Sequence, residues 1–113
     1  MLHVKHSYQW LSRMVVRLIV SFKDQGTEDI FDGEDSKAAR RTLPSNLHLR
    51  GAKTLDRLSA AVSLQSLSLP GLRLEKLRGD RSGQYSIRIN DQYRVCFRWT
   101  EAGAEDVEIV DYH

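Results

Sequence analysis

The chain has 113 residues, of which 41% are hydrophobic and 28% are charged, so a single domain with one modest core is expected. A net charge of +2 is too small to indicate a class of partner, and the single cysteine, Cys96, excludes an intrachain disulfide. No motif for a metal or cofactor is present, and the longest apolar run, residues 14–20, is too short to span a membrane, so a cytoplasmic protein is expected.

The first predicted element is a β-strand over residues 15–22 (VVRLIVSF), which is rich in β-branched residues. Because the segment is almost continuously apolar, we expect it to be buried on both faces or to lie centrally in a sheet. The strand pattern begins at Met14. We therefore expect residues 14–113 to form the domain and residues 1–13 to be an extension, either a disordered arm or the product of a mis-assigned start.

Three helices are predicted after this strand, over residues 27–32, 36–43 and 45 to about 62. Gly33 is typical of a helix stop, and Ser36 or Asp35 is suited to the N-cap of the second helix. Pro44 separates the second helix from the third. The apolar residues of the third helix share one face, which we expect to pack on the core: Leu47, Leu55, Leu58 and Val62.

The second half of the chain has the alternating pattern of strands. After a loop over residues 63–73 and a turn-rich segment at 79–83, three strands are predicted over residues 84–89, 92–99 and 107–110. Asn90 and Asp91 suit a hairpin turn between the first two. The order of elements predicts an α+β fold with two layers, in which helices cover one face of a mostly antiparallel sheet.

Charge is unevenly distributed over the predicted strands. Residues 73–98 contain seven basic and three acidic residues, whereas residues 99–113 contain five acidic residues and no Lys or Arg. A local basic field suits a polyanion such as RNA, and a solvated strand face explains the pattern equally well. The face of the strands that we expect to be exposed carries three arginines at alternate positions: Arg88, Arg94 and Arg98.

The chain end combines three side chains with possible chemistry, Asp111, Tyr112 and His113. Metal-independent RNA scission needs a group that takes the 2′-hydroxyl proton and cations that stabilise the charged phosphorane. Imidazole suits proton transfer near neutral pH, and guanidinium suits the charge. From the residues alone, a frayed terminus explains Tyr112 and His113 more simply than catalysis does.

Three stretches of the sequence are similar to one known family. The run RLEKLRGDRSGQYSIRINDQYRVCFRW (residues 73–99) and the terminal VEIVDYH closely resemble HigB-type toxins of the RelE/ParE superfamily, with the GraT-like subgroup the most similar. The opening VRLIVSFKDQGTEDIFDG resembles them too, so the likeness covers residues 14–113. It implies an N-terminal strand and helices packed on a small, curved, mostly antiparallel sheet.

The resemblance also implies an activity and partners. Such a toxin belongs to a type II toxin–antitoxin system and cleaves messenger RNA in the ribosomal A site. It is neutralised by a HigA-type helix-turn-helix antitoxin, and it reaches operator DNA only through that antitoxin. No cofactor is implied, and the partners are the antitoxin, the ribosome and messenger RNA.

Site residues follow from the same resemblance. His113 corresponds to the terminal general base, Tyr112 would stack on the substrate, and Asp111 would orient a partner. Arg78 and Arg94 would bind the scissile phosphate. Further basic residues are expected to contact RNA: Arg73, Arg81, Arg88 and Arg98.

One position departs from the pattern, because Glu75 stands where some HigB toxins have a histidine. A carboxyl group could carry a proton there only if it were buried, so the general acid is left open. Glu75 also keeps alternatives open. The chain could be a catalytically weak toxin that serves mainly as the partner of its antitoxin, or a ParE-like protein that inhibits DNA gyrase without cutting RNA.

Overall fold

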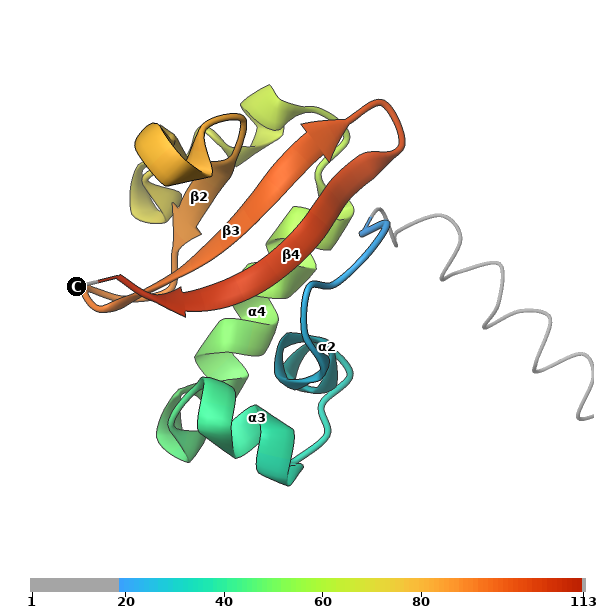
Figure 1. The fold of residues 1–113 in the computed structure, drawn as a ribbon, viewed down its shortest axis with the longest axis vertical. Helices are drawn as coiled ribbons and strands as arrows, with labels where there is room; N and C mark the ends of the chain where they lie inside the picture. The colour runs from blue at the N-terminus through green and yellow to red at the C-terminus, as the bar shows by residue number, and fades with distance from the viewer. Residues whose placement is uncertain (1–18, 113) are drawn as a thin grey trace, which may run out of the picture.

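Three α-helices form one layer of the structure, a computed structural model that describes residues 19–112 (Figure 1). They are α2 (Gln25–Phe31), α3 (Lys37–Thr42) and α4 (His48–Ala60). Capping side chains fix where the first two begin: the carboxylate of Asp24 accepts from the backbone N–H of Thr27 at 2.7 Å, and Ser36 Oγ accepts from Ala39 at 2.9 Å. The predicted helices are therefore present, with α2 beginning two residues earlier than expected.

Helix α4 follows a 3₁₀ turn, η1 (Ser45–Leu47), and buries Leu55 and Leu58 completely. The placement of Val62 on the same apolar face is wrong, because α4 ends at Ala60 and the chain is already extended at Ala61. Val62 is consequently 83% exposed.

The segment after α4 was predicted as a loop and contains two more 3₁₀ turns, η2 (Leu64–Leu67) and η3 (Pro70–Leu72). Each contributes one buried leucine to the core, Leu67 and Leu72. The segment is therefore packed against the domain rather than solvated.

The second layer is a four-stranded antiparallel sheet in the sequential order β1-β2-β3-β4 (Figure 1). Its strands are β1 (Glu75–Lys76), β2 (Tyr85–Arg88), β3 (Tyr93–Thr100) and β4 (Gly103–Asp111). The predicted α+β class and the three-stranded meander are confirmed. Strand β1 was not predicted, because two residues are too few to show an alternating pattern.

Residues 19–22 lie at the edge of this sheet, beside β4. Ile19 and Phe22 form isolated parallel bridges with Ala104 and Val107, and Val20 is 49% exposed. The prediction of a central or doubly buried strand is therefore wrong for these residues, because within residues 19–112 a strand neighbours them on one flank only. The rest of the predicted strand and the proposed extension lie outside the described residues.

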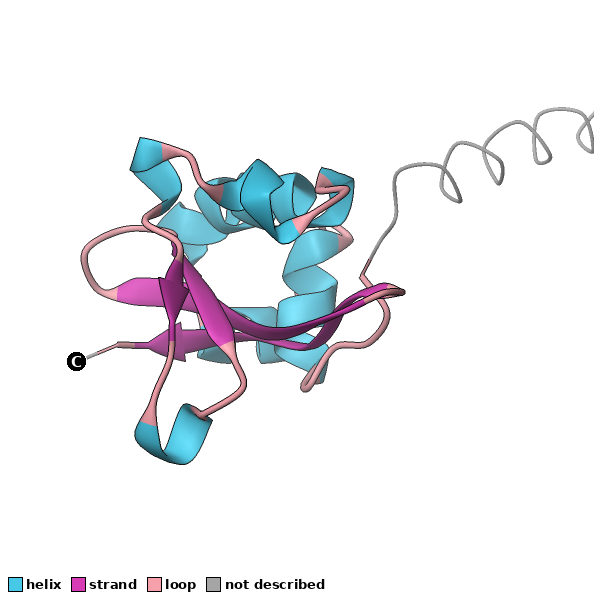
Figure 2. Cartoon of the chain, turned by 90° about the horizontal axis from the view of Figure 1, so that it is seen from above, coloured by secondary structure: helices cyan, strands magenta, loops and turns pink. Residues whose placement is uncertain are grey.

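The core lies between the two layers, where Ile87, Val95 and Phe97 of the sheet meet Leu55 and Leu58 of α4. The opposite face of the sheet is partly covered as well. The short 3₁₀ turn η4 (Gly79–Arg81), which joins β1 to β2, lies on that face, away from the α-helices (Figure 2). None of the helices within residues 19–112 has the length and apolar character that a membrane crossing requires.

Candidate functional site

Arg94 lies on β3 at the sheet face opposite the α-helices, and its guanidinium is held from three sides. Nε donates to Ser86 Oγ at 2.7 Å, and Nη2 donates to the backbone carbonyl of Arg73 at 2.5 Å. Nη2 also lies 3.5 Å from Glu75 Oε1. The residue is only 8% exposed, so the expectation of an exposed strand arginine is wrong. The alternating pattern of the strand predicts the face of Arg94 correctly. The side chain is buried because residues 73–75 lie over it.

The backbone at Arg73 is what presents its carbonyl to Arg94. Arg73 ends η3 with φ 46° and ψ 55°, a left-handed conformation that costs a non-glycine residue about 1–2 kcal/mol. The hydrogen bond to a charged donor offsets a cost of this size. Arg73 therefore contributes to the site through its main chain, which the sequence did not indicate.

Tyr112 closes the fourth side of the Arg94 guanidinium. The carbon Cζ of Arg94 lies 5.4 Å from the centroid of the Tyr112 ring, within the range of a cation–π contact. The backbone N–H of Tyr112 donates to the carbonyl of Gln92 at 2.6 Å, and Gln92 Nε2 donates to Asp111 Oδ2 at 3.1 Å. The prediction of a frayed chain end is therefore wrong for Tyr112. His113 lies outside the described residues.

A second cationic cluster adjoins the first, centred on Arg81 in η4. Arg81 Nη1 donates to Glu108 Oε1 at 2.9 Å and to Gln84 Oε1 at 3.0 Å, and Lys23 Nζ lies 3.7 Å from the same Glu108 oxygen. The hydrogen bond that Arg81 donates to Glu108 raises the pKa of Arg81, and the nearby Tyr112 phenol acts in the same direction. Arg81 is thus a cation that Glu108 anchors close to Tyr112.

Cys96 lies in β3 beneath this cluster, paired across the strands with Ser86 and Glu108. Its side chain is fully buried, and burial raises the pKa of the thiol. The thiol stays protonated at neutral pH, which confirms the prediction of a buried, inert cysteine.

The remaining arginines of the predicted site differ in whether they form an ion pair with an acidic side chain. Arg78 is exposed just before η4 and forms no ion pair with any residue between 19 and 112. Arg88 pairs with Asp91, and Arg98 Nε lies 3.7 Å from Asp106 Oδ2. Arg78 is thus the more available cation for a phosphate group.

Glu75 does not meet the condition set for a proton carrier. Its side chain is 55% exposed and ion-paired with Arg94 rather than buried. The general acid therefore stays open, because β1 lies at the edge of the sheet and leaves Glu75 exposed.

Two residues of the site were missed from the sequence, Ser86 and Glu108. Ser86 is fully buried and accepts the Nε–H of Arg94, and Glu108 anchors Arg81. The alternation of the strands already placed Ser86 on the arginine face, which was the available signal; nothing local pairs Glu108 with Arg81, 27 residues earlier. Among residues 19–112, no three His, Cys, Asp or Glu side chains gather where they could hold a metal ion.

Comparisons with known proteins agree on one family. Residues 20–113 match the model of the HigB-like toxins, described as RelE-like toxins of the type II toxin–antitoxin system HigB. The chain is 36% identical over 88 residues to "Toxin HigB-1" of Vibrio cholerae, covering 77% of this chain and 90% of that protein. It is 27% identical over 96 residues to "Endoribonuclease HigB" of Proteus vulgaris, covering 85% and 100%.

Among solved structures, the chain resembles one in the "YoeB-YefM complex from Staphylococcus aureus", with a TM-score of 0.53 and 20% identity. The likeness covers 84% of this chain and 94% of that one. At this identity it establishes the shared RelE-like fold alone.

Proposed function

The chain belongs to the HigB-like family of RelE-like toxins from type II toxin–antitoxin systems, and from that membership we propose that it is an endoribonuclease that cleaves messenger RNA in the ribosomal A site. A curated relative is named as an endoribonuclease, which supports the activity. The names of the similar proteins do not favour the gyrase-inhibitor alternative.

The observation that carries the proposal is the contact between Arg94 and Tyr112. It joins Tyr112 to a preorganised guanidinium on the sheet face, with Arg81 of η4 nearby; Arg78 directly precedes η4 in the chain. Preorganised cations of this kind stabilise charge that develops in a transition state. The residue that follows Tyr112 is His113, the proposed general base.

Within the Arg94 network one nitrogen is left for a substrate. Nε and Nη2 are engaged by Ser86 and Arg73, whereas Nη1 donates to no residue between 19 and 112. We assign it, together with the exposed Arg78, to a scissile phosphate.

In the proposed reaction, the imidazole of His113 takes the proton of a ribose 2′-hydroxyl. The 2′ oxygen forms a bond to the adjacent phosphorus, and the bond from phosphorus to the 5′ oxygen breaks. The products are a 2′,3′-cyclic phosphate and a 5′-hydroxyl that is protonated by water. Arg94 and Arg78 stabilise the additional negative charge of the phosphorane.

The proposal includes a cellular setting. Action on translating ribosomes places the protein in the cytoplasm, and an antitoxin of the HigA type would restrain it. The antitoxin would carry the helix-turn-helix that binds operator DNA. The family assignment supports an antitoxin partner, and the structural neighbour is likewise part of a complex, that of YoeB with YefM.

Translation reactions with the full chain test the activity. Wild type should produce new 5′ ends at A-site codons in primer extension, and His113→Ala should lower the cleavage rate by about 10²-fold or more, the usual contribution of general acid–base catalysis. Arg41→Ala, which removes an exposed cation of α3, is the matched control and should cleave like wild type. Wild-type cleavage that does not depend on His113 would refute the assignment of the base.

A further inference from the structure

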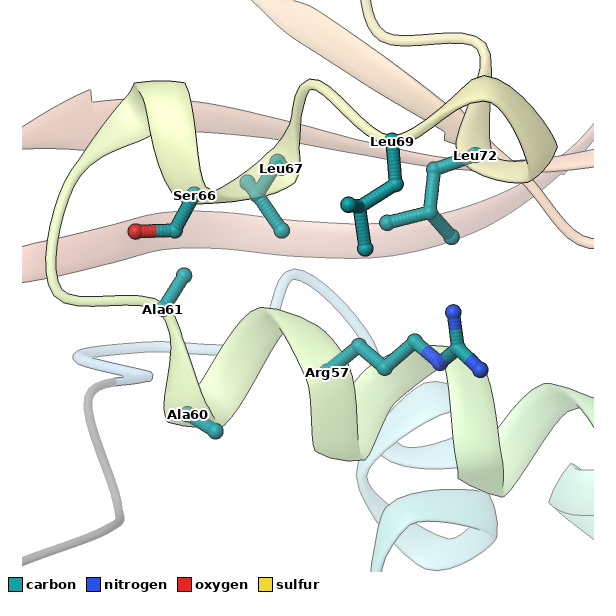
Figure 3. A pocket seen from close by; sticks show the side chains of 7 residues that line it. All are labelled: Arg57, Ala60, Ala61, Ser66, Leu67, Leu69 and Leu72. Atoms are coloured by element: carbon teal, nitrogen blue, oxygen red, sulfur yellow. The ribbon is translucent and has the colours of Figure 1, made fainter.

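An open groove of about 400 Å³ separates the C-terminal half of α4 from the segment that carries η2 and η3. Ala60 and Ala61 line one wall, and Leu67, Leu69 and Leu72 line the other (Figure 3). Leu69 is 47% exposed, and Val62 beside the groove is 83% exposed. Exposed apolar side chains gathered around a hollow are typical of a surface that binds another polypeptide.

The groove has a cationic edge. Arg57 extends from α4 toward Leu69 and Leu72 (Figure 3) and forms no ion pair with any residue from 19 to 112. Lys53 and Arg50 lie one and two turns earlier on the same side of the helix, also without an ion pair among those residues. Since Asp56 is the only acidic residue of α4, the edge is net positive and favours a segment that combines apolar and acidic side chains.

Charge argues against two other occupants. Residues 1–18 of the chain contain Lys5, Arg13 and Arg17 and no acidic residue, so this segment would add cations beside Arg57. A second copy of the chain, docked symmetrically through the same face, would bring a second set of these cations into the same interface. Like charges facing each other across an interface cost binding free energy.

We propose that this groove is a docking site for the antitoxin, which inserts an apolar side chain between α4 and residues 64–72 and brings a carboxylate to Arg57. The inference rests on the proposed function, because only a toxin of a toxin–antitoxin pair has this partner. The groove lies on the helical side of the domain and the Arg94 site on the opposite face of the sheet, so the two can be changed separately.

The test is calorimetric titration of the full chain with the purified product of the adjacent open reading frame. Leu69→Asp and Arg57→Glu should each raise the Kd at least about tenfold, or about 1.4 kcal/mol. The matched controls are Leu49→Asp, which changes another exposed leucine outside this groove, and Arg41→Glu; both should bind within about twofold of wild type. Circular dichroism confirms that each variant is folded.

Groove variants that bind as tightly as the controls would overturn the assignment. Messenger RNA cleavage by the same preparations separates this failure from failure of the proposed function. If wild type cleaves and binds while the groove variants keep their affinity, only the docking site is wrong. If wild type neither cleaves nor binds the adjacent gene product, the proposed function fails and the docking site fails with it.

Discussion

At the scale of single residues, the centre of the site is a buried charge with partners on Nε and Nη2. Arg94 is 8% exposed, and burying a guanidinium costs free energy that paired donors offset. Ser86, Arg73 and Glu75 supply that pairing, and Tyr112 covers the face of the group. The same contacts that stabilise Arg94 in the fold hold it in one orientation toward the substrate side.

Replacing Ser86 with Ala tests this double role. Because the hydroxyl oxygen accepts the buried Nε–H of Arg94, its loss leaves a charged donor without a partner. We expect the free energy of unfolding to fall by about 1–3 kcal/mol and the cleavage rate to fall as well. Urea titration and primer extension measure the two effects. Ser68→Ala, at an exposed serine, should change neither; equal behaviour of the two variants would contradict the role of Ser86.

At the scale of elements, the helical layer depends on one close approach between α2 and α3. A Cβ atom at Gly26 would lie 1.9 Å from Thr42 Oγ1 and 2.6 Å from the backbone carbonyl of Ala38. Gly26→Ala should therefore force the helices apart and cost about 3 kcal/mol or more of stability, at the upper end of overpacking effects. In Gly71→Ala the new methyl group meets nothing within 4 Å, so its unfolding free energy should stay within about 0.5 kcal/mol of wild type. Chemical denaturation of both decides the prediction.

The junction between α2 and α3 also gives a pH dependence. Hydrogen bonds from Ser36 Oγ and Gln25 Nε2 lower the pKa of Asp29. A lowered pKa in the folded state stabilises the protein above the unfolded pKa of about 3.9. That contribution is lost as the pH falls through the folded value.

Asp29→Asn should accordingly be less stable than wild type at pH 7, with the difference shrinking at pH 3. Unfolding titrations at the two pH values measure it. Glu34→Gln, whose side chain makes no hydrogen bond within residues 19–112, is the control. A difference for Asp29→Asn that is the same at both pH values would count against the hydrogen-bonded carboxylate.

The elements also show what the sequence could predict and where local patterns were insufficient. The start of α3 could be predicted because its capping side chain, Ser36, acts within three residues, whereas α2 is capped by Asp24 and begins two residues before the predicted start. The burial of Arg94 could not be predicted in this way. It depends on Arg73, which lies 21 residues earlier in the chain and contacts Arg94 on the sheet face. The role that the resemblance gives to His113 remains a prediction. Glu75 is not buried, so it does not meet the condition for acting as a proton carrier.

At the scale of the whole molecule, one segment connects the two proposed surfaces. Residues 64–72 form a wall of the antitoxin groove, and the next residue, Arg73, holds Arg94 through its carbonyl. The basic and the acidic parts of the chain also meet at the site. Arg94 and Arg81 gather on the sheet face, and Glu108 of the acidic C-terminal strand anchors Arg81. The acidic end of the chain thus positions the cations rather than repelling RNA from them.

The central claim is that His113 and Arg94 act on one RNA phosphate, and a double-mutant cycle tests it most directly. Cleavage rates of messenger RNA in translation reactions would be compared for wild type, His113→Ala, Arg94→Lys and the double variant. Residues that act as a unit are strongly non-additive, so the double variant should be about as slow as the slower single variant. Losses that multiply, as for two independent sites, would contradict the account.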